Sequence, residues 1–131
     1  MNADQVRNYF LSCPEAIEDF PFGNEVHVFK IRKKMFGFLA HREGFARVNL
    51  KCDPDEAIML RKRFESVIPG YHMNKIHWNT LILDGTVPDD EIEVMIENSY
   101  DLVVNKLKKV DRVSLRIRHQ SARYIELFSK R

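Results

Sequence analysis

The sequence predicts an α+β domain of two layers, in which an antiparallel sheet of about five strands carries helices on one face. The 131 residues are enough for a single hydrophobic core. Apolar residues recur at helical spacing near the start of the chain and again after residue 53, but they alternate between residues 25 and 52. The alternating segments are joined by only two or three residues, which forces neighbouring strands to run antiparallel.

The first helix is expected over residues 2–13. Asn2 and Gln5 have the spacing of a capping box, in which each side chain accepts a hydrogen bond from the other residue's backbone. The face expected to be buried holds Val6, Tyr9, Phe10 and Cys13. Residues 14–23 are expected to form one helical turn before proline and glycine end it.

Three strands are expected next, at residues 25–31, 33–41 and 45–52, with turns at Arg32-Lys33 and at residues 42–44. Alternation divides the third strand into two faces. One face should point toward the helices and carries Ala46, Val48, Leu50 and Cys52. The other should point away from them and carries Phe45, Arg47, Asn49 and Lys51.

A second helix should begin after Asp53, which is a suitable N-cap followed by proline, and should end before Pro69. Residues 78–83 are expected to form another strand, and a long helix should start near Asp89, where acidic residues complement the helix dipole. After Lys109, alternation of Val113, Leu115 and Ile117 predicts a short strand, and residues 121–131 predict a final helix.

Charge is distributed unevenly along the chain. Residues 106–131 hold nine Lys or Arg against two Asp or Glu, which leaves twelve basic and seventeen acidic residues in the first 105. We therefore expect one domain at residues 1–109 and a basic C-terminal extension at 110–131 that packs on the same domain. The extension would be attracted to nucleic acid and to the acidic remainder of the chain alike.

The N-terminal residues lack the apolar segment of a secretory signal, and no stretch has the length of a membrane-spanning helix. Cys13 and Cys52 are far apart and lack the spacing of a redox or metal motif. Two isolated thiols suit a reducing compartment. We expect a cytoplasmic monomer with no membrane contact.

Two stretches, VNLKCDPDEA at 48–57 and PGYHMNKIHWNTLILDGTVPD at 69–89, resemble the MmcQ/YjbR family of small bacterial proteins. The resemblance covers roughly residues 5 to 107 and implies a fold similar to the frataxin-like (CyaY-like) sandwich. Members of that family are commonly described as DNA-binding proteins with a double-wing arrangement. The resemblance implies that the hairpins at Arg32-Lys33 and at residues 41–45 correspond to the wings.

Together with the cations at the expected turns, this resemblance leads us to expect a non-enzymatic protein that binds DNA with low sequence specificity, mainly through phosphates. The expected contacts lie at hairpin tips and on the outer sheet face: Lys30, Arg32, Lys33, Lys34, Arg42, Arg47, Lys51, Lys75 and Trp78. Two structural roles compete with this hypothesis. A basic turn also protects a sheet edge from aggregation, and Trp78 would also pack well under the loop at 69–76.

The alternative is an interaction module for a small molecule or a protein, in which the 71–79 loop forms a polar and aromatic pocket. Its lining would be His72, Asn74, His77, Trp78 and Asn79. No metal site, cofactor or catalytic residue is expected. A spacing of five cannot aim both histidines at one ion from a regular element, and the motifs of common hydrolases and phosphate-binding loops are absent. Iron binding by analogy with frataxins is disfavoured, because the first helix holds only Asp4, balanced by Arg7.

Overall fold

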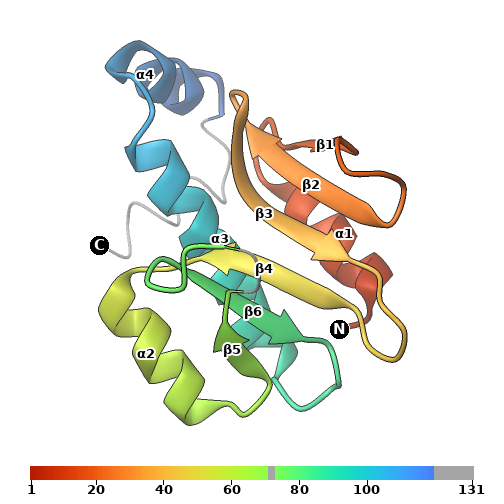
Figure 1. Ribbon diagram of the computed structural model, residues 1–131. Helices are drawn as coiled ribbons and strands as arrows, with labels where there is room; N and C mark the ends of the chain where they lie inside the picture. Colours follow the sequence, from red (N-terminus) through yellow and green to blue (C-terminus); the bar gives the residue numbers. More distant parts are fainter. Residues whose placement is uncertain (71–72, 120–131) are drawn as a thin grey trace.

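The computed structural model describes residues 1–70 and 73–119. Six antiparallel strands form one sheet in the order β1-β2-β3-β4-β6-β5, with the helices α1, α2 and α3 on one face (Figure 1). In chain order the elements are α1 Ala3–Ser12, β1 Ile17–Asp19, β2 Val26–Ile31, β3 Lys34–Ala40, β4 Arg47–Lys51, α2 Pro54–Arg63, β5 Val67–Pro69, β6 Trp78–Ile82, α3 Asp89–Asn105 and α4 Lys109–Arg118. The predicted two-layer α+β class is confirmed.

The helix caps follow the sequence signals. The Asn2 side chain accepts a hydrogen bond from the Gln5 backbone, and the Gln5 side chain accepts one from the Asn2 backbone, as the capping box predicts. Asp53 caps α2, with a proline in its first turn. These caps satisfy backbone N–H groups that a helix leaves unpaired at its start, so the starts of both helices were readable from local sequence.

The core lies between the sheet and the helices. The rings of Phe10 in α1 and Phe29 in β2 stack with centroids 4.2 Å apart. Phe36 in β3 packs edge-on against Tyr100 in α3, whose hydroxyl donates a hydrogen bond to the Pro14 carbonyl. These contacts tie the N-terminal helix, the sheet and the long helix into one packed unit.

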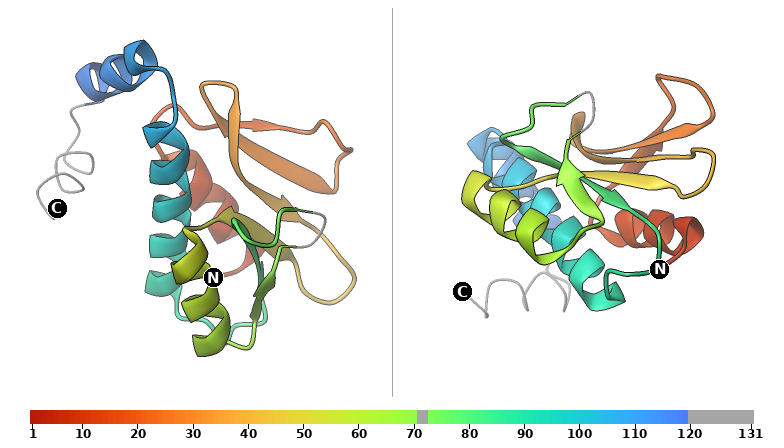
Figure 2. Two further views of the ribbon diagram at one scale, coloured as in Figure 1. Left: turned by 60° about the vertical axis from the view of Figure 1, so that its left-hand side comes forward. Right: turned by 60° about the horizontal axis from the view of Figure 1, so that its bottom comes forward.

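The strand register assigns the two faces of the sheet. In β4, Val48 and Leu50 are buried on the helix side, and Arg47, Asn49 and Lys51 alternate with them on the outer side. Cross-strand pairing then sets Lys51 opposite Trp78, Asn49 opposite Thr80 and Arg47 opposite Ile82. The predicted division of this strand into two faces is confirmed. Figure 2 shows the loops at residues 20–25 and 41–46 extending on the side away from the helices.

Two expectations about secondary structure were wrong near the N-terminus and the middle of the chain. Residues 17–19 form the edge strand β1 instead of a helical turn, because they pair with β2 along Ile17–Lys30 to Asp19–Val28. Residues 67–69 form the strand β5 instead of the end of a helix, because Val67 pairs with Leu81. Each segment is only three residues long, too short for hydrophobic period to reveal it.

The expected strand at 113–117 was also wrong, because these residues belong to α4. One face of this helix carries Asp111, Ser114 and Leu115, and Leu115 is fully buried. Arg32 donates hydrogen bonds to Asp111 and Ser114, so tertiary contacts select the helix over the alternating pattern. The helix expected at 121–131 lies outside the described residues.

No helix in the described ranges is long and apolar enough to cross a bilayer. The likeness to frataxin-like proteins stays a prediction.

Candidate functional site

The β2–β3 hairpin turns through only two residues, Arg32 and Lys33, between the paired residues Ile31 and Lys34. Both central residues have positive φ, 48° for Arg32 and 69° for Lys33. Two-residue hairpin loops favour this geometry, but glycine and asparagine adopt it at much lower cost than arginine or lysine. Arg32 and Lys33 are therefore unfavourable for the backbone conformation of this turn. What they add, compared with an Asn-Gly turn, is two positive charges.

Beside this hairpin, β3 and β4 separate from each other. Their pairing ends at Gly37 and Leu50, and the Ser99 hydroxyl of α3 enters between the two strands. It donates a hydrogen bond to the Phe36 carbonyl and accepts one from the Lys51 N–H at 2.9 Å. Figure 1 shows β3 diverging from β4 at this end, with α3 behind the opening.

A basic cleft of about 620 Å³ occupies the space between the hairpin tip and the junction of α3 with α4. Its lining residues are Arg32, Lys33, Lys34, Lys106, Leu107, Lys108 and Asp111. The Lys51 side chain lies close enough to Lys106 for the positive charge of Lys106 to act on it. We call the five lysines of this region the lysine cleft: Lys33, Lys34, Lys51, Lys106 and Lys108.

The electrostatics of the lysine cleft are unbalanced. Burial, and then the positive charge of Lys106, hold the pKa of Lys51 below its usual value of 10.5. Asp111 is the one acidic residue that lines the cleft within the described ranges, and it accepts a hydrogen bond from Arg32 at 3.3 Å. Of the described residues, none forms a salt bridge with any of the five lysines.

The start of α4 adds to this field. Lys108 is its N-cap and makes no side-chain capping hydrogen bond. The positive end of the helix dipole therefore lies at the lysine cleft, where Asp111 in the first turn is the one carboxylate among the described lining residues and is shared with Arg32. A phosphate is the type of group that such a combination attracts.

Two of the predicted DNA-binding cations are engaged in ion pairs. Lys30 donates to Asp19 at 2.8 Å. Arg32 donates to both carboxylate oxygens of Glu15 and also reaches Asp111. The Glu15 contact holds the pKa of Arg32 above its usual value, and it holds the pKa of Glu15 below its own. These cations connect elements of the fold, so they contribute less free charge than the sequence suggests.

Three other predicted cations are not among the residues that line the cleft. Arg42 is in the loop that follows β3, about 20 Å from the start of this seven-residue strand at its usual rise. Arg47 lies across the sheet from Ala40, at that same end. Lys75 is exposed in the segment that precedes β6. The structure therefore places Arg42 and Arg47 at the end of β3 opposite to the hairpin tip, apart from Lys33 and Lys34.

Trp78 is on the outer face but only 9% exposed. Gly70 packs directly against it, and a Cβ atom added to Gly70 would lie 2.8 Å from the Cβ of Trp78. Gly70 N–H also donates to the Trp78 carbonyl at 2.8 Å. A side chain with so little exposure offers little ring surface for stacking on a nucleobase.

The residues of the alternative pocket do not share one described cavity. Asn79 points to the helix layer, where it accepts a hydrogen bond from Arg61 and donates one to the Ala57 carbonyl, opposite to Trp78. The Asn74 side chain accepts from the Ile76 N–H and so closes a turn. The His77 carbonyl accepts from the Cys52 N–H. His72 lies outside the described residues.

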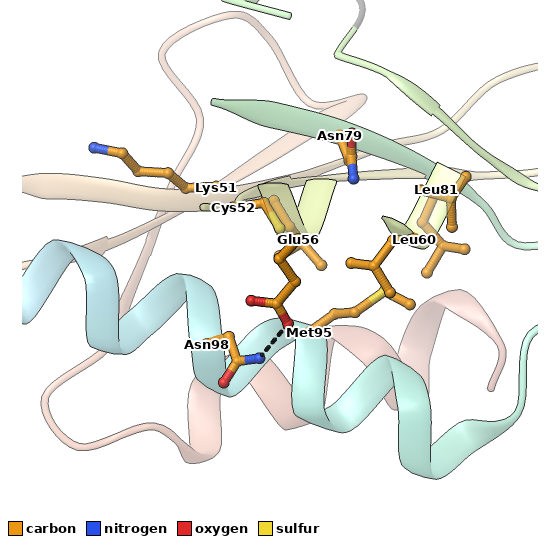
Figure 3. Close-up of a pocket in the computed structure, with 10 residues that line it drawn as sticks. Lys51, Cys52, Glu56, Leu60, Asn79, Leu81, Met95 and Asn98 are labelled. Atoms are coloured by element: carbon orange, nitrogen blue, oxygen red, sulfur yellow. Dashed lines mark hydrogen bonds between the residues drawn. The ribbon is translucent and has the colours of Figure 1, made fainter. Parts of the chain in front are cut away.

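Cys52 and Asn79 line a cavity of about 20 Å³ between the sheet, α2 and α3, which has room for about one water molecule (Figure 3). Burial is the largest cause that raises the pKa of the Cys52 thiol to about 12. A thiol with that pKa is protonated at neutral pH and is a poor nucleophile. Within residues 1–70 and 73–119, no group of three His, Cys, Asp or Glu side chains is placed to hold a metal ion.

Comparison with known proteins identifies the family. The family model described as YjbR matches residues 11–102, which is more than half of the chain. The chain belongs to the YjbR family. This confirms the family resemblance seen in the sequence.

Similar proteins of known sequence or known structure match most of this chain. The Escherichia coli O157:H7 protein YbdF is 36% identical over 97 residues, which are 74% of this chain and 80% of YbdF. YjbR of E. coli K12 is 30% identical over 112 residues, which are 86% of this chain and 95% of the relative. The crystal structure of the Deinococcus radiodurans protein DR2400 is 36% identical and superposes with a TM-score of 0.81 over 87% of both chains. A Pseudomonas syringae crystal structure is 29% identical, with a TM-score of 0.69, and covers 78% of this chain and 98% of that one.

The sequence analysis did not select Lys106 and Lys108 as contact residues, although both were counted in the excess of basic residues at 106–131. The YjbR family match ends at residue 102, so these two lysines follow the matched region. Their position beside the hairpin depends on the turn from α3 into α4, which local sequence pattern did not predict. A usable signal was present in the run of basic residues at 106–109 directly after the long helix.

Proposed function

We propose that this YjbR protein binds double-stranded DNA without catalysis, through phosphate contacts made by the lysine cleft. The observation that carries the proposal is the concentration of lysines at one cleft. Four lysines line it, Lys51 lies beside Lys106, and the described residues supply no salt bridge to any of the five. Lysine binds phosphate as a point charge and needs no precise orientation. The expected binding is therefore tolerant of sequence.

The proposal changes the set of contacting residues that the sequence favoured. Lys33, Lys34 and Lys51 remain, and Lys106 and Lys108 join them. Lys30 and Arg32 act in the fold through their ion pairs. Trp78 is left out because its ring is nearly buried.

The decisive experiment is fluorescence anisotropy with labelled 20-base-pair duplexes of two unrelated sequences, titrated with protein at several salt concentrations. With five phosphate contacts, log K should fall against log salt with a slope of about −4.5. That slope corresponds to a loss of affinity of about 500-fold between 50 and 200 mM salt. The two sequences should bind within about threefold of each other, because phosphate contacts carry no sequence information.

Two matched double variants locate the interface. Lys33→Gln with Lys34→Gln removes two charges at the lysine cleft, and Lys62→Gln with Lys75→Gln removes two exposed charges elsewhere. The first pair should reduce the salt slope by about 1.8, and the second should leave it unchanged. No anisotropy change at micromolar protein, or equal effects of the two pairs, would contradict the proposal.

A further inference from the structure

A second concave surface lies on the outer face of the sheet and shares no lining residue with the cleft at the hairpin tip. Its volume is about 400 Å³, within the range of about 300–1,000 Å³ that is typical of small-molecule sites. Its described lining consists of Phe22, Val26, Met35, Phe38, Ala40, Arg42, Arg47, Asn49, Met73 and Thr80. We call it the outer pocket.

Strand register builds the floor of the outer pocket. Val26 of β2 faces Ala40 of β3, Phe38 faces Asn49 of β4, and Asn49 faces Thr80 of β6. Four strands at about 4.8 Å spacing give a floor about 14 Å wide, suited to an apolar chain of about ten carbons. The floor rests on paired backbone and is therefore formed before any ligand arrives.

The polar groups of this floor satisfy one another. The Thr80 hydroxyl donates to the Asn49 side-chain carbonyl at 2.6 Å, and both residues are buried. The rest of the floor is apolar. Phe22 at the rim is 75% exposed, although its ring is among the largest apolar side chains. An apolar body would gain free energy by covering this ring together with Phe38 and Met35.

Arg47 supplies the second observation. Its Nε atom is buried and has no hydrogen-bond partner within the described residues. A buried guanidinium N–H without an acceptor is unfavourable. No carboxylate is among the described residues that line the outer pocket, so the charge of Arg47 is not balanced there. A carboxylate is the group whose two oxygens match a guanidinium fork.

We infer that the outer pocket binds a small monocarboxylate with an apolar body of medium-chain length, with its carboxylate on Arg47 and its chain over Phe38 and Ala40. This site is separate from the lysine cleft and does not depend on DNA binding. The combination of an apolar floor with a guanidinium whose Nε has no acceptor among the described residues distinguishes the ligand class. A neutral lipid would leave Arg47 unpaired, and a polyphosphate would leave the floor uncovered.

The probes are decanoate and decanol, which share a chain length and differ in the carboxylate. Binding to the full chain is followed by ¹H–¹⁵N NMR titration, which reports the location from the amides of β2, β3, β4 and β6. Decanoate should saturate with shifts centred on Phe38, Ala40 and Thr80. Decanol should bind at least ten times more weakly.

Three variants test the assignment. Arg47→Met should weaken decanoate at least tenfold and leave decanol unchanged, and Lys62→Met on α2 is the control for loss of one charge. Ala40→Leu adds volume to the floor and should weaken both probes, which tests the pocket even if Arg47→Met fails to fold. Because Ala40 and Lys34 are at opposite ends of β3, about 20 Å apart at the usual rise, Ala40→Leu should leave duplex binding unchanged.

The inference is overturned by equal affinity for decanoate and decanol. It is also overturned by shifts that lie away from the outer pocket, by binding that survives Ala40→Leu, or by equal weakening from Arg47→Met and Lys62→Met. Absence of any shift at millimolar decanoate contradicts it as well.

Discussion

Two neighbouring regions of this molecule use cations differently. In the first, Arg7, Lys30 and Arg32 meet Glu18, Asp19 and Glu15, three carboxylates of the segment at residues 15–19. In the second, the lysine cleft, the described residues provide no salt bridge to any of its five lysines. Arg32 and Lys33 are adjacent in sequence and belong to different regions.

This difference shows that cations adjacent in the sequence need not form one unpaired basic surface in the folded protein. Arg32 has a fork that fits the Glu15 carboxylate, and it also reaches Asp111 and Ser114 of α4. It thereby fixes both the hairpin and the last described helix. Among the described residues, none forms a salt bridge with the lysines beside it, so their field is available to an external anion.

The largest expected effect separates the two regions by function. Replacing Lys33, Lys34, Lys106 and Lys108 with glutamine should lower duplex affinity by more than about 100-fold at 50 mM salt, because four phosphate contacts are lost. The melting temperature should stay unchanged, since no ion pair is broken. Anisotropy and thermal unfolding measure the two quantities.

The matched control neutralises the paired region. Arg7→Gln with Lys30→Gln should lower the melting temperature and leave duplex affinity within about threefold. If both sets of substitutions weakened DNA binding equally, the distinction between paired and unpaired cations would be incorrect.

Glu15→Gln should loosen the junction between the hairpin and α4. The glutamate accepts hydrogen bonds from Arg32 and interacts with His119 at 2.6 Å, so its loss should cost about 1–2 kcal/mol of unfolding free energy. Chemical denaturation at pH 7 measures this cost. Duplex affinity should not fall, because Arg32 gains free charge.

Glu15→Gln should also change how the free energy of unfolding depends on pH in the acidic range. The Arg32 hydrogen bond holds the pKa of Glu15 below its usual 4.5 in the folded protein. Its contribution is therefore present above that value and is lost as pH falls through the lower folded pKa. Denaturation from pH 7 to pH 3 should show a shallower loss for Glu15→Gln, and identical slopes would argue against this role.

Lys33→Gly should stabilise the protein, although substitution by glycine usually destabilises a folded protein. Because Lys33 has a φ of 69°, glycine should relieve backbone strain and raise the unfolding free energy by about 0.5–1 kcal/mol. Duplex affinity should fall severalfold through the loss of one charge. Lys34→Gly, at the first residue of β3, is the control and should destabilise the protein.

The smallest effect concerns Lys51. Lys106→Met should raise the pKa of Lys51 part of the way toward 10.5, because one charge disappears while burial, the larger cause, remains. A ¹³C-detected titration of the lysine side chains measures it. In the unsubstituted protein the depressed pKa means that unfolding free energy rises with pH as the folded Lys51 loses its proton. An unchanged Lys51 titration would show that the two ammonium groups do not interact.

Sequence reasoning succeeded where one local signal decided the outcome. The capping box at Asn2, the Asp53 cap and the alternation in β4 each predicted structure that the register and hydrogen bonds bear out. It failed where partners distant in sequence decided. β1 forms because its residues pair with β2. α4 is a helix because Arg32 hydrogen-bonds to Asp111 and Leu115 packs in the core.

The candidate site shows the same limit. Exposed lysines at the hairpin tip followed from the turn at Arg32-Lys33. The neutralisation of Arg32 by Glu15 joins residues 17 positions apart, and the approach of Lys106 to Lys51 depends on the path of α3. Neither follows from spacing, because charge pairing between elements depends on their packing.

The Ser99 hydroxyl occupies a position where two strands would otherwise bond to each other. Phe36 and Lys51 both satisfy their backbone groups on this one oxygen. At the end of the sheet that carries the lysines, β3 and β4 are therefore separated. At the other end they remain paired from Gly37 to Ala40. The spacing of the lysine ammonium groups at this end is therefore fixed by the fold, and a polyanion could bind there without breaking strand pairing.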